Sequence, residues 1–146
     1  MNRGAVAHLS RRFRFSASHR LHVDALPPER NRELFGKCNN PFGHGHNYTV
    51  QVTFSGPVNA ATGMVTNLAD LDAFTSREVL VHYDHANLNT LECFRDMVPS
   101  TENLCIEMWR IFAEYPHARL ERIRIEETNN NAFDYFGDGA PIIHHE

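Results

Sequence analysis

The sequence has few cysteines, no long apolar segment and no excess of basic residues. Its three cysteines, Cys38, Cys93 and Cys105, are an odd number and lie far apart, which is a poor disulfide framework and favours a reducing, cytoplasmic compartment. No apolar run approaches the roughly 18 residues that a membrane-spanning helix needs. The 14 basic and 18 acidic residues give a formal net charge of −4, whereas nucleic-acid binding needs surplus Lys and Arg. We therefore expect neither a membrane nor a nucleic-acid partner.

The chain is long enough for one domain and is unusually rich in histidine. Its 146 residues include ten histidines, and no linker divides them into two units. We predict a single domain over residues 1–146, with flexible ends at 1–11 and 138–146. The positions of the histidines then decide whether they have a chemical role.

Alternating apolar and polar residues predict the strands. Arg12–Arg20 and His46–Phe54 alternate with the period of a strand, and a polar loop that includes Glu29–Glu33 separates them. A short strand is expected at Met64-Val65 after a turn, and a last strand at Leu120–Glu127.

Two segments have the apolar spacing of helices. The first follows Asn67, a potential N-cap, with Leu68, Leu71, Phe74 and Val81 near one stripe. The second begins after Pro99, with Ser100 or Thr101 as its cap, and its buried stripe consists of Leu104, Cys105, Met108, Ile111 and Phe112. The order of elements predicts an α+β domain in which the helices pack on one face of an antiparallel sheet.

Three histidines are expected to meet at one end of this sheet. His44 and His46 are two apart at the start of a strand, so they share its inward face, and His19 continues the inward series of the first strand. If the two strands pair antiparallel, the end of one lies beside the start of the other. Three imidazoles with an open fourth position are typical of catalytic zinc, and no cysteine pair suggests a closed structural site.

A cysteine and an Asp-His pair are candidates for proton transfer. Cys38 lies in a turn-rich loop beside Lys37, and we expect this positive charge to lower the thiol pKa. Asp84 could tune His85 for acid–base work, although the pair would equally suit the C-terminal end of the first helix.

Glu127 is predicted to point inward, in register with Ile123 and Ile125. A carboxylate on an apolar face needs a charged or doubly hydrogen-bonding partner. A ligand with two parallel N–H donors and a buried arginine are both compatible with this position.

Several motifs together resemble the 6-pyruvoyl-tetrahydropterin synthase family. The resemblance extends from about Phe13 to Gly137, and the run from Cys38 to Tyr48 is its most specific part. The similar segments are Phe15–Leu21, Phe35–Tyr48, Thr62–Val65, Asp84-His85, Ser100–Asn103 and Glu127–Asn130. Two positions depart from the family pattern, with Asn129 where Asp is expected and Ala86 where Lys is common.

The resemblance implies a fold, a reaction and a set of site residues. The fold is the tunnelling fold, a four-stranded antiparallel sheet with two helices on one face, assembled as a homohexamer of two trimers with active sites between subunits. The implied reaction is loss of triphosphate from 7,8-dihydroneopterin triphosphate, with zinc as cofactor and magnesium accompanying the triphosphate. The implied roles are zinc ligation by His19, His44 and His46, proton abstraction by Cys38, relay by Asp84 and His85, and pterin binding by Glu127, Thr101 and Glu102.

Other functions remain open on the sequence. The 6-carboxytetrahydropterin synthases of queuosine biosynthesis share the substrate, fold and zinc ligands, but their loop between the Cys and the His pair is typically shorter than Cys38–His44. A non-catalytic pterin- or zinc-binding relative would not need Cys38, Asp84 and His85. A zinc hydrolase is disfavoured because no nucleophile motif accompanies the histidines.

Overall fold

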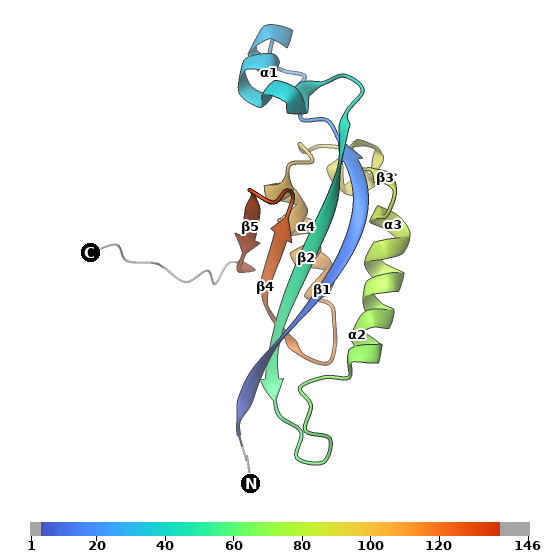
Figure 1. The fold of residues 1–146 in the computed structure, drawn as a ribbon, viewed down its shortest axis with the longest axis vertical. Helices are drawn as coiled ribbons and strands as arrows, with labels where there is room; N and C mark the ends of the chain where they lie inside the picture. Colours follow the sequence, from blue (N-terminus) through green and yellow to red (C-terminus); the bar gives the residue numbers. More distant parts are fainter. Residues whose placement is uncertain (1–3, 138–146) are drawn as a thin grey trace, which may run out of the picture.

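A five-stranded sheet forms the centre of the molecule, with strand order β3-β1-β2-β4-β5 (Figure 1). The structure is a computed structural model and describes residues 4–137. The sheet consists of β1 (Val6–His19), β2 (His44–Pro57), β3 (Ala86–Asn87), β4 (Arg119–Glu126) and β5 (Ala132–Tyr135). All pairs are antiparallel except the two-residue β3, which pairs parallel with β1. The predicted α+β fold is confirmed, but the sheet has five strands where four were expected, since β3 and β5 were not among the strands read from the sequence and Met64-Val65 is not a strand.

The principal helices cover one face of this sheet, and a short additional helix lies beyond its end. The sheet is covered by α2 (Leu68–Thr75), α3 (Val81–Tyr83) and α4 (Thr101–Phe112), whereas α1 (Pro28–Phe35) lies past the end where β1 stops and β2 starts (Figure 1). The remaining turns are η1 (Gly36–Asn39), η2 (Ser76–Leu80), η3 (Leu88–Thr90) and η4 (Glu92–Phe94). Within residues 4–137, none of the helices has the length and apolar character needed to cross a membrane.

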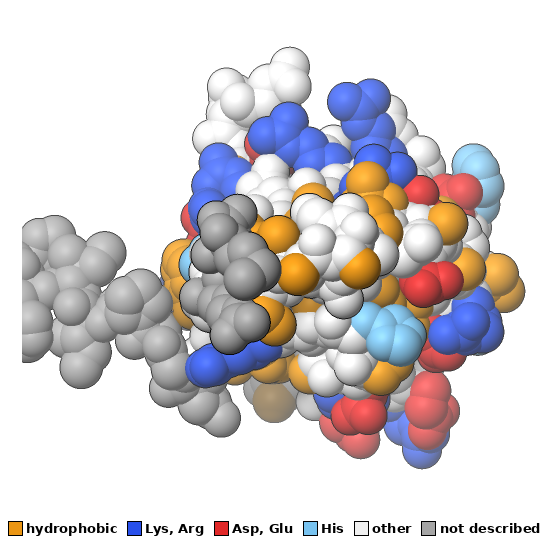
Figure 2. Space-filling model, turned by 90° about the horizontal axis from the view of Figure 1, so that it is seen from below, with side chains coloured by type: hydrophobic (Ala, Val, Ile, Leu, Met, Phe, Trp, Pro, Cys, Tyr) orange, Lys and Arg blue, Asp and Glu red, His pale blue; other side chains and the backbone are white. Residues whose placement is uncertain are grey.

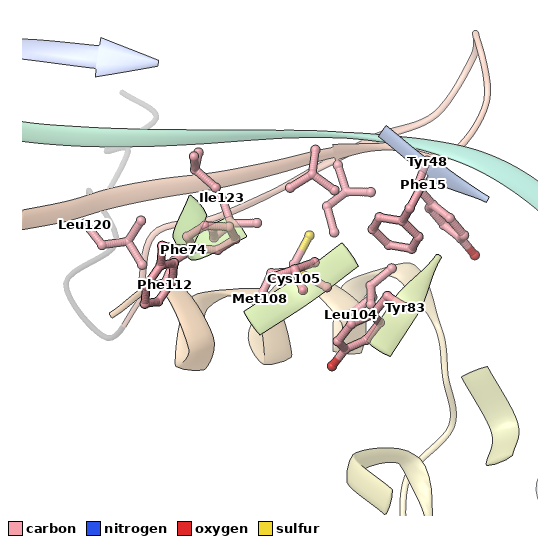
Figure 3. Close-up of a cluster of buried hydrophobic side chains, with 14 of the residues drawn as sticks. Phe15, Tyr48, Phe74, Tyr83, Leu104, Cys105, Met108, Phe112, Leu120 and Ile123 are labelled. Carbon is pink, nitrogen blue, oxygen red and sulfur yellow. The ribbon is translucent and has the colours of Figure 1, made fainter. Parts of the chain in front are cut away.

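The core lies between the inward side chains of the sheet and helix α4. Phe15 and Tyr48 extend from the strands toward Leu104, Met108 and other α4 residues (Figure 3). Tyr48, Leu104 and Met108 are fully buried, and full burial of such a side chain contributes about 1.5–3 kcal/mol. The predicted α4 stripe is confirmed, since Leu104, Cys105, Met108 and Phe112 are buried and Ile111 is partly buried.

The N-caps of both long helices also agree with the sequence. The Asn67 side chain accepts hydrogen bonds from the backbone N–H groups of Ala69 and Asp70. The Ser100 hydroxyl accepts one from the N–H of Asn103, which makes Ser100 the cap and Thr101 the first helical residue.

Three local predictions are wrong. Strand β1 begins at Val6, so residues 6–11 are strand and not a flexible lead, because each pairs with a residue of β2 up to Val6 opposite Pro57. The expected loop around Glu29–Glu33 contains α1, whose signal was Pro28 at the first helical position. Met64-Val65 is not a strand. The predicted flexible end 138–146 lies outside the described residues.

A π-helical turn changes the register of the first covering helix. The five residues of η2 form this turn between α2 and α3. The additional residue that it inserts rotates the following turn, so that Val79 is fully buried and Val81 is 75% exposed. The sequence prediction assumed an uninterrupted helical period and therefore placed Val81 in the buried stripe. Leu68, predicted for the same stripe, is also exposed, at 39%.

Candidate active site

The register of β1 and β2 brings the three predicted histidines together. In this pairing His19 lies opposite His44, and Ala17 lies opposite His46. Because alternate residues of a strand share a face, all three imidazoles extend from the inward side at one end of the sheet. The expectation that the end of the first strand meets the start of the second is confirmed.

The imidazole nitrogens have the spacing of a metal site. One nitrogen from each of the three rings lies within 4.8 Å of the others, and His19 Nε2 is 3.2 Å from His44 Nε2. Two nitrogens bound tetrahedrally to one zinc ion would be about 3.3 Å apart. His46 Nε2 and His44 Nδ1 are buried without a hydrogen-bond partner in the described residues. A buried nitrogen without a partner costs free energy, and a metal ion would satisfy His46 Nε2. The three residues could therefore hold a metal.

The backbone before α4 fixes the orientation of His19. Its Nδ1 lies 2.8 Å from the carbonyl oxygen of Pro99, which can only accept, so Nδ1 donates the hydrogen bond. The lone pair is then on Nε2, the atom that faces His44. Metal-ligating histidines commonly donate their other ring N–H to a carbonyl in this way. The alternation along the strands contained no signal for this contact.

Burial keeps the His19 and His44 imidazoles neutral, as metal ligation requires. Burial lowers the pKa of His19, partly opposed by the Pro99 hydrogen bond. Burial also lowers the pKa of His44, and the neighbouring His46 adds to this effect. Both rings therefore present a free lone pair at neutral pH.

Gly43 allows the chain to turn into this cluster. Its φ is +72°, and a Cβ atom at this position would lie 3.1 Å from the carbonyl oxygen of His19. A larger residue would be strained in its backbone and would crowd the strand that carries the first ligand. Glycine thus permits the close approach of β1 and the loop before His44.

Glu127 points into the cluster, where its side chain is only 13% exposed. Its Oε1 accepts a hydrogen bond from the Thr101 hydroxyl at 2.8 Å and lies 3.5 Å from His46 Nε2 and 3.7 Å from His19 Nε2. The predicted inward direction is confirmed. Among residues 4–137 its partners are this hydroxyl and the imidazoles, and no arginine pairs with it.

Glu102 stays outside this group. It is exposed in the first turn of α4, and the described residues give it no hydrogen bond or ion pair. Its buried neighbour Thr101 is the residue of this turn that contacts Glu127.

Cys38 lies in η1, half-buried, with a thiol pKa that differs from the sequence prediction. Burial raises the pKa of Cys38, and the negative charge of Glu127 raises it further. The prediction that Lys37 lowers this pKa is wrong, because the Lys37 side chain is exposed to solvent, which screens its charge. The effect of Glu127 also shows that the thiol lies within electrostatic reach of the carboxylate.

Asp84 and His85 are attached to a different part of the sheet. The Asp84 carboxylate accepts a hydrogen bond from the Ser16 N–H at 3.0 Å, and the His85 N–H donates to the Ser16 carbonyl oxygen at 2.6 Å. The His85 ring is 83% exposed, and the residue adopts φ of 60°, which is uncommon for a residue other than glycine.

The Asp84–His85 pair is separate from the remaining candidates within one chain. No hydrogen bond or ion pair in the described residues joins either one to Cys38, Glu127 or the histidine cluster. His85 lines a pocket with Ser16, Ser18 and Asn47 from the outward face of the sheet, and His46 of the histidine cluster lines the same pocket. Hydrogen bonds and ion pairs therefore divide the predicted residues into two groups, which share only the lining of this pocket.

Comparison with known proteins agrees with this fold. A family model described as 6-pyruvoyl tetrahydropterin synthase matches residues 8–138. The 6-pyruvoyl tetrahydrobiopterin synthase of Homo sapiens is 45% identical over 138 residues, which are 93% of this chain and 95% of that protein. The structure of Caenorhabditis elegans 6-pyruvoyl tetrahydropterin synthase superposes with a TM-score of 0.86 at 40% identity and covers 91% of this chain and 96% of that one.

A shorter match is to a protein named as a 6-carboxytetrahydropterin synthase. The putative 6-carboxy-5,6,7,8-tetrahydropterin synthase of Archaeoglobus fulgidus is 36% identical over 89 residues, which are 60% of this chain and 70% of that protein. The chain belongs to the 6-pyruvoyl tetrahydropterin synthase family.

The first prediction concerns the metal. Replacing His44 with Ala removes one of three converging nitrogens, so we expect metal affinity to fall by at least about 100-fold. His82→Ala, on the exposed surface of α3, is the matched control and should bind as the unchanged protein does. Titration with Zn²⁺ or Co²⁺ against a chromophoric chelator measures the difference. Equal affinity in the two variants would contradict the site.

The second prediction concerns Cys38. Its raised pKa means that less thiolate is present at neutral pH than in a free thiol, so alkylation by iodoacetamide should accelerate only on the alkaline side of the ordinary thiol range. Glu127→Gln removes the nearby negative charge and should move the profile of rate against pH to lower pH. Mass spectrometry of the Cys38 peptide from metal-free protein gives the rate. In Glu126→Gln, a control on the exposed neighbour, the profile should stay unchanged.

Proposed function

We propose that this chain is a zinc-dependent lyase that converts 7,8-dihydroneopterin triphosphate to 6-pyruvoyl-tetrahydropterin with loss of triphosphate. The observation that carries the proposal is the placement of a mostly buried, hydroxyl-bonded carboxylate within 3.7 Å of two of three convergent imidazoles. Membership of the family supports the same reaction.

The histidines would hold the metal next to the reacting carbons of the substrate. When bound by His19, His44 and His46, zinc supplies Lewis-acid chemistry, which makes a neighbouring C–H bond of the substrate more acidic. The Pro99 carbonyl keeps the first imidazole in the tautomer that presents Nε2.

Glu127 would anchor the pterin ring. Its carboxylate can accept two parallel N–H bonds from the pyrimidine edge, and the Thr101 hydroxyl holds one of its oxygens in place. Because Glu127 lies beside the cluster, a ring bound there directs the reacting carbons of the substrate toward the imidazoles.

Cys38 would be the base. Its thiolate takes a proton from the side-chain carbon next to the ring, and the released electron pair moves into the C=N bond of the ring, which is thereby reduced. In a later step the middle side-chain carbon loses its proton, and that electron pair forms a carbon–carbon double bond to the terminal carbon as the C–O bond to triphosphate breaks. A base whose pKa is raised binds the proton more strongly once it is deprotonated, which favours this abstraction.

The remaining proton transfer would come from a neighbouring copy of the chain. Asp84 and His85 lie apart from Cys38 in one chain, so an assembly in which the partner's His85 reaches the site would complete it. Two features support such an assembly. Over residues 6–14 the outer edge of β1 has no pairing strand within the described residues. Phe42, two residues before His44, is 96% exposed.

We further propose that the assembly is a homohexamer of two trimers in the cytoplasm. The sheet's open edges can pair between subunits, which would cover their unpaired backbone groups. Three free cysteines, well separated in the sequence, suit a reducing compartment.

Formation of 6-carboxytetrahydropterin is the second candidate. It would use the same substrate and the same metal ligands. The long loop between Cys38 and His44 and the more extensive match to proteins named for the pyruvoyl product favour the first reaction.

The third prediction separates these products. The zinc-loaded protein should release 6-pyruvoyl-tetrahydropterin and triphosphate, whereas 6-carboxytetrahydropterin together with acetaldehyde would overturn the assignment. Cys38→Ala should lower turnover by about 10²-fold to 10⁴-fold and leave zinc content intact. Cys93→Ser is the control and should stay active. Product chromatography and zinc analysis provide the measurements, and full activity of the Cys38 variant would exclude the thiol as base.

The fourth prediction tests whether the site is shared. Cys38→Ala and His85→Ala should each have strongly reduced activity alone, because each lacks one of the two proton-transfer groups. Mixed oligomers, formed by refolding the two variants together, should regain part of the activity, since some sites combine intact residues from different subunits. Mixtures whose activity stays at the level of the single variants would show that both groups act within one chain.

A further inference from the structure

A basic pocket lies beside the turn that carries Cys38. It has a volume of about 360 Å³, within the range of small-molecule sites. Its cations are Arg20, Arg32 and Lys37, to which His22, Asn39 and Asn40 add hydrogen-bonding groups. Gly36, Pro28 and Pro41 complete the lining, and no carboxylate is part of it.

The three cations are unusual because they have no acidic partner. In residues 4–137, Arg20, Arg32 and Lys37 make no ion pair, whereas Arg30 on the same helix pairs with Glu33 at 3.2 Å. Most other arginines are paired in the same way, for example Arg11 with Asp72. The end of the molecule opposite α1 likewise presents side chains of both signs (Figure 2). A protein of net charge −4 thus concentrates unpaired positive charge at this pocket.

The adjoining pocket is different. It shares Arg20 and His22 but also contains Asp24 and Asp96. The two carboxylates in this adjoining pocket disfavour the binding of an anion. Of the two pockets, the basic pocket is therefore the one whose lining suits an anion.

Hydrogen bonds hold the walls of the basic pocket together. Asn39 is buried, its Nδ2 donates to the Leu21 carbonyl at 2.8 Å, and its own carbonyl accepts from Arg20 Nε at 3.1 Å. The Leu21 N–H donates to the Cys38 carbonyl at 2.7 Å. The segment that carries Arg20 is therefore tied to the turn that carries the thiol.

Helix α1 is anchored as well. The fully buried Asn31 accepts from the Val23 N–H at 2.8 Å and donates to the Val23 carbonyl at 2.9 Å. Its neighbour Arg32 is thereby presented to the pocket from a fixed helix. Guanidinium groups bind phosphate oxygens in bidentate fashion, and donors that are already positioned lose less entropy on binding.

We propose that Arg20, Arg32 and Lys37 form a polyphosphate-binding pocket, which receives the triphosphate of the substrate and retains it as the leaving group. This rests on the proposed function, because Cys38 lies in the sequence between Lys37 and Asn39, two residues of the pocket. When the C–O bond breaks, the electron pair leaves with the triphosphate, and the fixed cations stabilise the negative charge that develops on it.

The test uses Arg32→Gln with Arg30→Gln as the matched control. Both changes remove one arginine from the same helix, but only Arg32 lines the pocket. For the metal-loaded protein and inorganic tripolyphosphate, we expect Arg32→Gln to weaken binding at least about tenfold and Arg30→Gln less than about twofold. Calorimetry at low ionic strength measures both. Equal weakening in the two variants would indicate nonspecific surface attraction and overturn the pocket, as would unchanged binding in Arg32→Gln.

Substrate kinetics separate this proposal from the proposed function. Arg32→Gln should raise KM for dihydroneopterin triphosphate and leave the affinity for phosphate-free dihydroneopterin unchanged, whereas a general structural defect would weaken both. If the unchanged enzyme fails to convert dihydroneopterin triphosphate, the proposed function is wrong, and the tripolyphosphate measurement still decides the pocket. If it turns over normally while Arg32→Gln matches Arg30→Gln, only the pocket is wrong.

Discussion

The antiparallel pairing of β1 with β2 is the constraint on which the site depends. A shift of one residue in this register would turn His44 and His46 to the opposite face of the sheet and separate them from His19. The same register places Phe15 opposite Tyr48 and Phe13 opposite Val50, so that the packing against α4 and the metal cluster are fixed together. The site is therefore held by the core that stabilises the fold.

Residues outside β1 and β2 set the chemistry of the histidine cluster. The Pro99 carbonyl and the Thr101 hydroxyl, on either side of the Ser100 cap, hold His19 and Glu127 respectively. The start of α4 thereby links the metal ligand to the carboxylate proposed to bind the pterin. The η1 turn contributes Cys38 on one side and, with α1, the basic pocket on the other.

Sequence patterns predicted the strongly periodic elements and the inward face of the site. They indicated the two long strands, the caps at Asn67 and Ser100, and the shared direction of His19, His44, His46 and Glu127. They failed where the local pattern is weak or interrupted: α1 is polar nearly throughout, and the four-residue β5 is too short to show a period. The π-helical turn at Ser76–Leu80 interrupts the helical period, whereas the sequence prediction continued that period unchanged from Leu68 to Val81.

The sequence by itself determined which residues could meet, because alternation along a strand assigns each side chain to a face. It also determined the family, through motifs whose order and spacing are specific. Only the tertiary structure decided the electrostatics: burial and Glu127 raise the pKa of Cys38 where Lys37 had been expected to lower it. The tertiary structure also attaches Asp84 to β1, away from the Cys38 thiol, and brings Arg32 into one pocket with Arg20 and Lys37. Neither arrangement could be read from the sequence, because each depends on distances between segments that are far apart in the chain.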